Sequence, residues 1–144
     1  MIGLKEYREY WERVTARVPA LTECLPVTID KEMAAKIQRI KKETVTLFFL
    51  PPAAQSIARD PDNYREDTQC IVLVMAKYDP QRETSFDVLE RTQPIIEEIK
   101  GIMQYDAATG CPVMRIDWPS LNTLPETEFY ADFAGWSLGF TITR

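Results

Sequence analysis

The chain has no histidine among its 144 residues, only three cysteines and only five glycines. The absence of imidazole excludes Ser–His and Cys–His nucleophiles and every zinc site that uses a histidine ligand. No glycine-rich phosphate-binding motif occurs. The cysteines Cys24, Cys70 and Cys111 form no C-x-x-C pair, and an odd number at wide spacing is typical of reduced thiols in a cytosol-like compartment. We therefore expect a protein that is not an enzyme and holds no metal or cofactor.

The chain also lacks any apolar run approaching the ~18 residues of a membrane-spanning helix. Charges interrupt the N-terminal segment MIGLKEYREYWERV, unlike the apolar centre of a signal peptide. The net charge is −5 and the isoelectric point about 4.8, a balance that opposes nucleic-acid binding. The basic run at 36–42 is interpreted as the exposed side of a helix. We expect neither nucleic acid nor a membrane as partner, and a location in the cytoplasm or in a virion.

Apolar spacing and capping residues predict three helices, at 3–18, 31–42 and 84–104. In the second helix, Asp30 is the predicted N-cap and Met33 lies on the predicted buried edge. Thr84 and Asp87 fit a capping box at the start of the third helix. Pro94 lies inside this helix, so we expect it to kink or divide the helix.

β-branched and aromatic residues predict four strands, at 44–50, 68–78, 111–118 and 135–143. Residues 21–29 and 119–135 are interpreted as irregular connecting segments, and 51–67, with three prolines, as a long exposed loop. The predicted order is α-α-β-β-α-β-β, without strict alternation of strands and helices. This order predicts a single α+β domain over residues 1–144, with a mainly antiparallel four-stranded sheet and helices packed on one face.

The last strand has one face of large apolar residues and one face of small residues. Trp136, Leu138, Phe140 and Ile142 alternate with Ser137, Gly139, Thr141 and Thr143. The large face is predicted to pack on the helices. The small face either meets water or lets another chain lie flat against the sheet. The strand at 68–78 is apolar on both faces, which predicts a central position covered on both sides, with a partner chain supplying part of the cover.

Two sets of residues are therefore candidates for interaction. They are Arg59, Asp60, Tyr64 and Arg65 in the long loop, and Ser137, Gly139 and Thr141 on the small face. The loop segment DPDNYRE spaces its acidic residues like a calcium loop. However, Tyr64 and Arg65 stand where an EF-hand needs Asp or Asn and then Gly, so a polar loop tip is favoured over a metal site.

Two segments carry a resemblance to a known family: DVLERTQPIIEEI at 87–99 and FYADFAGWSLGFTI at 129–142. With the order of an N-terminal helix, a long-looped hairpin, a helix and two closing strands, residues 44–144 resemble the tail-terminator and tail-completion or neck proteins of phages and prophages. The resemblance implies a ring, often hexameric, that ends tube growth or joins the tail to the head. Its partners would be itself and other tail or neck proteins. The loop at 51–67 would face the ring lumen or a neighbouring part.

Three hypotheses for function remain open. The leading one is a non-enzymatic structural protein of a phage or prophage tail that forms, or docks on, a homo-oligomeric ring. The alternative is an acidic protein-binding module, of regulatory or immunity type, because the net charge is −5. A second alternative is a small-molecule enzyme that uses carboxylates or tyrosine, which would need Asp117, Glu128 or Tyr130 clustered in a deep pocket.

Overall fold

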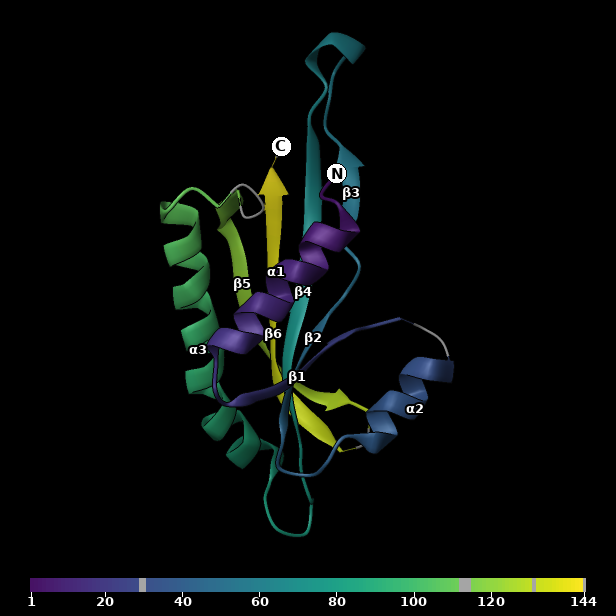
Figure 1. Cartoon of the computed structure of the whole chain (residues 1–144), viewed down its shortest axis with the longest axis vertical. Coiled ribbons are helices and arrows are strands. Elements are labelled where there is room, and N and C mark those ends of the chain that lie inside the picture. Colours follow the sequence, from purple (N-terminus) through teal and green to yellow (C-terminus); the bar gives the residue numbers. More distant parts are fainter. Residues whose placement is uncertain (29–30, 112–114, 131, 144) are drawn as a thin grey trace.

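The computed structural model describes residues 1–28, 31–111, 115–130 and 132–143. Its elements run in the order α1 (Leu4–Arg17), β1 (Leu21–Pro26), α2 (Lys31–Arg39), β2 (Val45–Phe49), β3 (Ala53–Ser56), the short 3-10 helix η1 (Pro61–Asn63), β4 (Glu66–Lys77), α3 (Ser85–Ala108), β5 (Ile116–Phe129) and β6 (Phe133–Thr143). The fold is α+β, as the sequence predicts (Figure 1). No helix in the described ranges is long and apolar enough to cross a membrane.

The sheet has six strands in the order β1-β2-β4-β6-β5, with β3 paired to β4 beyond the end of β2. β1 runs parallel to β2, and the other pairs are antiparallel. The prediction of a mainly antiparallel four-stranded sheet is therefore wrong, because the predicted connector at 21–29 contains β1 and the predicted loop at 51–67 contains β3. Pro26 suggested a connector, yet it ends an edge strand, a position that tolerates the missing N–H.

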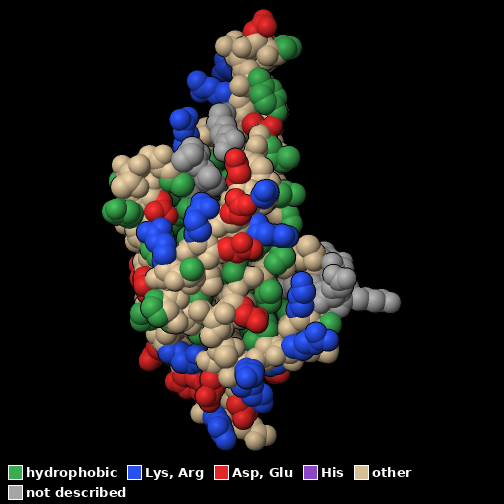
Figure 2. Space-filling model, in the orientation of Figure 1, with side chains coloured by type: hydrophobic (Ala, Val, Ile, Leu, Met, Phe, Trp, Pro, Cys, Tyr) green, Lys and Arg blue, Asp and Glu red, His purple; other side chains and the backbone are tan. Residues whose placement is uncertain are grey.

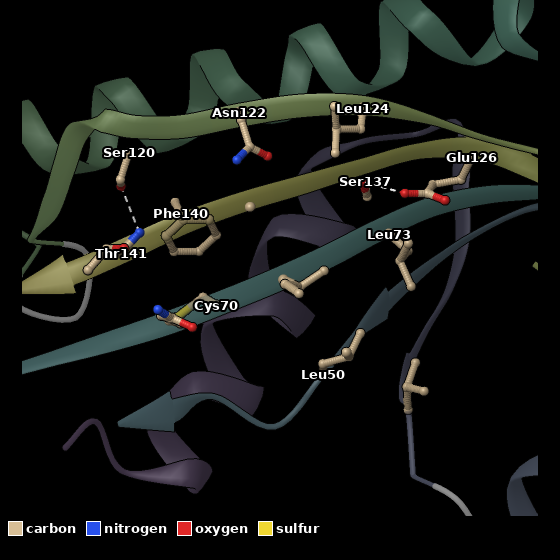
Figure 3. Close-up of a pocket in the computed structure, with 14 residues that line it drawn as sticks. Leu50, Cys70, Leu73, Ser120, Asn122, Leu124, Glu126, Ser137, Phe140 and Thr141 are labelled. Carbon is tan, nitrogen blue, oxygen red and sulfur yellow. Dashed lines mark hydrogen bonds between the residues drawn. The ribbon is translucent and has the colours of Figure 1, made fainter. Parts of the chain in front are cut away.

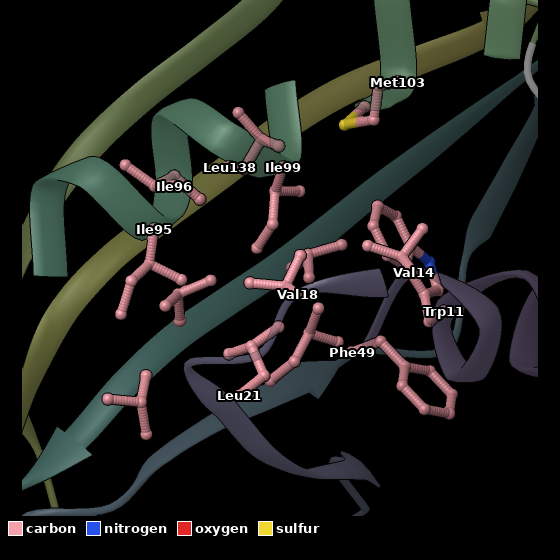
Figure 4. Packing of buried hydrophobic residues seen from close by; sticks show 14 of the residues in the cluster. Trp11, Val14, Val18, Leu21, Phe49, Ile95, Ile96, Ile99, Met103 and Leu138 are labelled. Carbon is pink, nitrogen blue, oxygen red and sulfur yellow. The ribbon is translucent and has the colours of Figure 1, made fainter. Parts of the chain in front are cut away.

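Helices cover both faces of the sheet, which corrects the prediction that they pack on one face. α1 and α3 bury the main core against β2, β4 and β6 (Figure 4). Ile37 of α2 and Ile40, which follows the helix, pack on the opposite face with Phe48, Met75 and Phe133. Asp30 and the side chain of Met33, predicted to start and bury α2, lie outside what the structure describes.

The main core is dominated by large side chains of the two longer helices. Trp11, Val14, Ile96, Ile99 and Met103 are fully buried. The large face of β6 joins them through Leu138, Phe140 and Ile142, and the Trp136 indole donates a hydrogen bond to the Leu89 carbonyl oxygen at 3.1 Å. The predicted packing of this face is thus confirmed. Burying each of these side chains contributes roughly 1.5–3 kcal/mol.

Two sets of hydrogen bonds fix the start and the end of α3. Thr84 and Asp87 form the predicted capping box at its start. Near its end, Asp106 accepts hydrogen bonds from the Tyr10 hydroxyl and the Arg17 guanidinium of α1, both at 2.9 Å. The helix is continuous across Pro94, so of the two predicted effects of this proline, a division of the helix is wrong.

β5 is an interrupted edge strand rather than the irregular segment predicted at 119–135. Residues 118–121 stand opposite only Phe140 of β6, which makes a large bulge. The Ser120 hydroxyl accepts a hydrogen bond from the Thr141 amide at 2.8 Å and donates one to the Asp117 carbonyl at 2.5 Å. The Ser120 hydroxyl therefore takes the place of a backbone acceptor in the pairing of β5 with β6. Because the pairing is interrupted here, this part of the sequence shows no regular alternation.

Candidate functional site

The face of the sheet opposite α1 and α3 is only partly covered, and we call its uncovered part the open face. Residues paired across neighbouring strands point to the same side of a sheet. Ser137 and Gly139 of β6 pair with Leu73 and Ile71 of β4 on one side, and with Leu124 and Asn122 of β5 on the other. The small face of β6 is therefore the floor of the open face.

The open face is hollowed into a groove of about 620 Å³ (Figure 3). Its lining comes from the β1–α2 connection and from β2, β4, β5 and β6. The side chains that point to the open face are Val27, Leu50, Gln69, Ile71, Leu73, Ser120, Asn122, Leu124, Glu126, Ser137 and Thr141. Because Gly139 carries no side chain, the centre of the floor stays low.

Apolar groups stand exposed in this groove. Ile71 is 43% exposed and Leu124 is 53% exposed, whereas Leu73, toward α2, is 8% exposed. The expectation that the strand at 68–78 is central is confirmed, since β4 lies between β2 and β6. Within one chain, cover on both sides holds at Met75 but not at Ile71, because α2 covers only one end of this face. Cover of Ile71 by a partner chain stays a prediction.

The polar side chains of the groove are hydroxyls and amides, with one carboxylate, Glu126. The Ser137 hydroxyl donates a hydrogen bond to Glu126 Oε1 at 2.9 Å, which orients this carboxylate across the floor (Figure 3). Register places Asp117, opposite Thr141, and Asp67, opposite Thr143, on the same side of the sheet as Glu126. The open face therefore has a floor of small residues flanked by the apolar Ile71 and Leu124, and it is acidic along β5 and at its far end.

Residues 53–69, which we call the arm, form a hairpin whose base belongs to the sheet, since Asp67 to Gln69 also pair with β6. Its tip, residues 57–65, projects beyond the body of the molecule (Figures 1 and 2). The two strands of the arm pair from Ala53 with Gln69 to Ser56 with Glu66, and Ile57 donates a further backbone bond to Arg65. All four residues of β3 are exposed. The predicted loop is thus a hairpin, with β-pairing and η1 giving it a defined shape.

The arm tip is ordered by its own side chains. Asp60 caps η1 by accepting hydrogen bonds from the amides of Asp62 and Asn63, both at 3.0 Å. The Tyr64 hydroxyl donates to Glu66, which also pairs with the amino group of Met1 at 2.7 Å. These bonds lower the pKa of Glu66, the amino group having the larger effect, and the bond to Glu66 raises the pKa of Tyr64.

The predicted interaction residues fall into these two regions. Ser137, Gly139 and Thr141 lie together in the groove, and the predicted loop residues stand exposed on the arm: Arg59, Asp60, Tyr64 and Arg65. Sequence reasoning missed Ile71, Leu124 and Ile57. The strand that contains Ile71 is predicted to need cover from a partner chain, but its alternation does not single out Ile71. Leu124 and Ile57 lie in segments without periodicity, where an isolated apolar residue was the available signal.

The described residues offer few features of a metal site, a carboxylate and tyrosine site or a reactive thiol. No group of three or more cysteine or acidic side chains is placed to hold a metal ion in the described part of the chain. Asp117 pairs near the end of β6, whereas Tyr130 follows β5 at the turn into β6, so the strand length separates them. The Glu128 side chain lies outside the described residues. Burial raises the pKa of the Cys24 and Cys70 thiols to about 11, which opposes thiolate formation at neutral pH.

No protein-family model and no curated protein matches this chain. The function is therefore argued from the groove and the arm.

Proposed function

We propose that this chain is a non-enzymatic assembly protein that joins copies of itself into a homo-oligomer through the open face and the arm. The exposure of Ile71 and Leu124 in a groove, on a sheet whose other face is covered by two helices, carries the proposal. Exposed apolar groups gathered in one concave surface are typical of protein–protein interfaces. Together with the resemblance of residues 44–144, this supports a ring-forming tail-terminator or neck component.

The arm supports the same proposal independently. A two-stranded hairpin that projects into solvent gains little stability from its own contacts. Its side chains from Ala53 to Ser56 are exposed, and Ile57 and Tyr64 are 47% and 61% exposed. Such an element is stabilised further when a neighbouring chain of an oligomer covers it.

The direct test is the mass in solution, measured by light scattering coupled to size exclusion over a concentration series. We expect a closed oligomer of defined mass, and negative-stain images of that species should show a ring with a central opening. Leu124→Lys places a charge in the groove and should shift the population to monomer. Tyr105→Lys is the matched control, because Tyr105 is exposed on α3, away from the groove. A monomer at every concentration in wild type would count against the proposal.

The acidic side of the open face favours a second candidate, a module that binds a basic protein partner. Asp67, Asp117 and Glu126 share this face, and the whole chain has a net charge of −5. Carboxylates around the groove would attract and orient a partner rich in lysine or arginine. Monomeric wild type that binds a basic partner with a strong salt dependence, lost in Glu126→Gln, would support this candidate over self-assembly.

A further inference from the structure

We propose that the occupant of the groove is the arm of a second copy of this chain. This inference rests on the proposed self-assembly and adds to it the identity of the two surfaces that meet. Each copy would then donate an arm and accept one, so every chain in a closed assembly would use both surfaces.

The arm and the groove present one continuous face. Alternate residues of β4 point to the same side of the sheet, so Leu73, Ile71 and Asp67 lie on the open face. Arg65 continues this alternation, and its carbonyl accepts the backbone bond from Ile57. Arg65 and Ile57 therefore face the same side as the groove, whereas Glu66 faces the side of the N-terminus.

The two surfaces are complementary in chemistry. The arm offers an apolar side chain, Ile57, beside the cationic Arg65, and Arg59 stands exposed nearby. The groove offers the apolar pair Ile71 and Leu124. Within the described part of the chain, the Glu126 carboxylate accepts a hydrogen bond from the Ser137 hydroxyl and forms no ion pair. Within the described residues neither Arg59 nor Arg65 forms an ion pair. A second copy would pair apolar with apolar groups and arginine with Glu126.

The dimensions also agree. From Ser56 to Asp60 the arm extends four residues past its last β3 pair, a reach of at most ~13 Å. The groove floor from Ser137 to Thr141 also spans four residue steps, ~13 Å of strand. The arm cannot fill its own groove, because its pairing to β4 holds it in line with the sheet (Figure 1).

A photo-crosslinking experiment tests the contact. Ile57 is replaced by benzoylphenylalanine in the full chain, and unlabelled and nitrogen-15-labelled proteins are mixed before irradiation. We expect crosslinks between chains of different label, mapped by mass spectrometry to β4 and β5 residues of the groove. The control places the same photo-residue at Phe86, which is 65% exposed at the start of α3, and should give no crosslink to the groove.

Charge reversal supplies a second, independent test. Arg65→Glu and Glu126→Arg should each raise the dissociation constant of the oligomer about tenfold. The double variant should restore it to within about threefold of wild type, which a purely structural effect of either substitution would not produce. Glu126→Gln keeps an acceptor for Ser137 and separates the loss of charge from the loss of that hydrogen bond.

The outcomes separate this inference from the proposed function. A defined oligomer that gives no arm-to-groove crosslink, or no rescue in the double variant, would overturn the arm as occupant while self-assembly stands. Crosslinks from Ile57 to another surface would do the same and would locate the true contact. A wild-type monomer at all concentrations would overturn both.

Discussion

Gly135 is the position where one added methyl group should damage this fold most. A Cβ built there would lie 1.9 Å from the Val74 carbonyl oxygen and 3.0 Å from the Met75 Cα. Both obstructing atoms are backbone atoms of β4, the central strand, so no side-chain rotation can relieve the clash. Gly139 lies on the same strand, but its Cβ would meet only the Asn122 side chain, at 2.9 Å from Oδ1.

Gly135→Ala must push β6 away from β4. Overpacking a rigid site costs about 1–3 kcal/mol, and one ladder hydrogen bond lost costs about 1 kcal/mol more. We therefore expect the free energy of unfolding to fall by about 3 kcal/mol. For Gly139→Ala, the loss of unfolded-state entropy favours the fold by about 0.5 kcal/mol and offsets the movement of Asn122, so its stability should stay within about 1 kcal/mol of wild type.

Urea denaturation followed by tryptophan fluorescence measures both variants. The midpoint should fall strongly for Gly135→Ala and little for Gly139→Ala, with the slope unchanged in each. If the two variants lost equal stability, or Gly135→Ala lost less than about 1 kcal/mol, the close approach of β6 to β4 would be contradicted.

Three further outcomes follow from the polar contacts. Asp106→Ala should lower the free energy of unfolding by about 2 kcal/mol in urea, because it leaves the buried Tyr10 hydroxyl without its acceptor, and Asp106→Asn should lose less. Thr84→Ala removes the capping box with Asp87 and should cost about 1 kcal/mol, read as a lower thermal midpoint. Burial raises the pKa of Tyr7 and Tyr10 in the folded chain. Their contribution to the free energy of unfolding is therefore complete below pH 10, and it is lost as the pH rises above 10, where the tyrosines of the unfolded chain ionise. Tyr10→Phe should reduce the steepness of this alkaline loss, measured by denaturation at pH 9 to 11.

Local signals were sufficient for the helices and for the buried strands. The capping box at Thr84 places the start of α3 within one residue, because its two hydrogen bonds depend only on residues three apart. The alternation from Trp136 to Ile142 places β6 and its buried face, since burial enforces a period of two. The helical spacing of Leu4 and Tyr7 predicts that both lie on the apolar stripe of the first helix, yet Leu4 is 60% exposed, while Tyr10 is buried.

Sequence patterns failed where pairing partners are distant. β1 and β3 exist because β2 and β4 offer edges to pair with, and neither segment carries an alternation of its own. The prediction that α2 packs on the same face as the other helices is wrong because an apolar stripe shows that a helix is covered, and does not show which face of the sheet covers it. Of the candidate site, the small residues of β6 could be predicted from the sequence. The exposure of Ile71 could not, because it depends on where α2 ends.

The interruptions of β5 oppose aggregation by addition of a strand at this edge of the sheet. Pro119 and Pro125 offer no N–H, and the bulge at residues 118–121 bends the outer edge out of register with any added strand. A neighbouring chain therefore cannot lengthen the sheet at this edge into a fibril. Growth by strand addition is open-ended, whereas contacts through a face end in a ring when the rotation between copies closes. If copies join through the open face, as we propose, the interrupted β5 edge separates that ordered assembly from open-ended growth of the sheet.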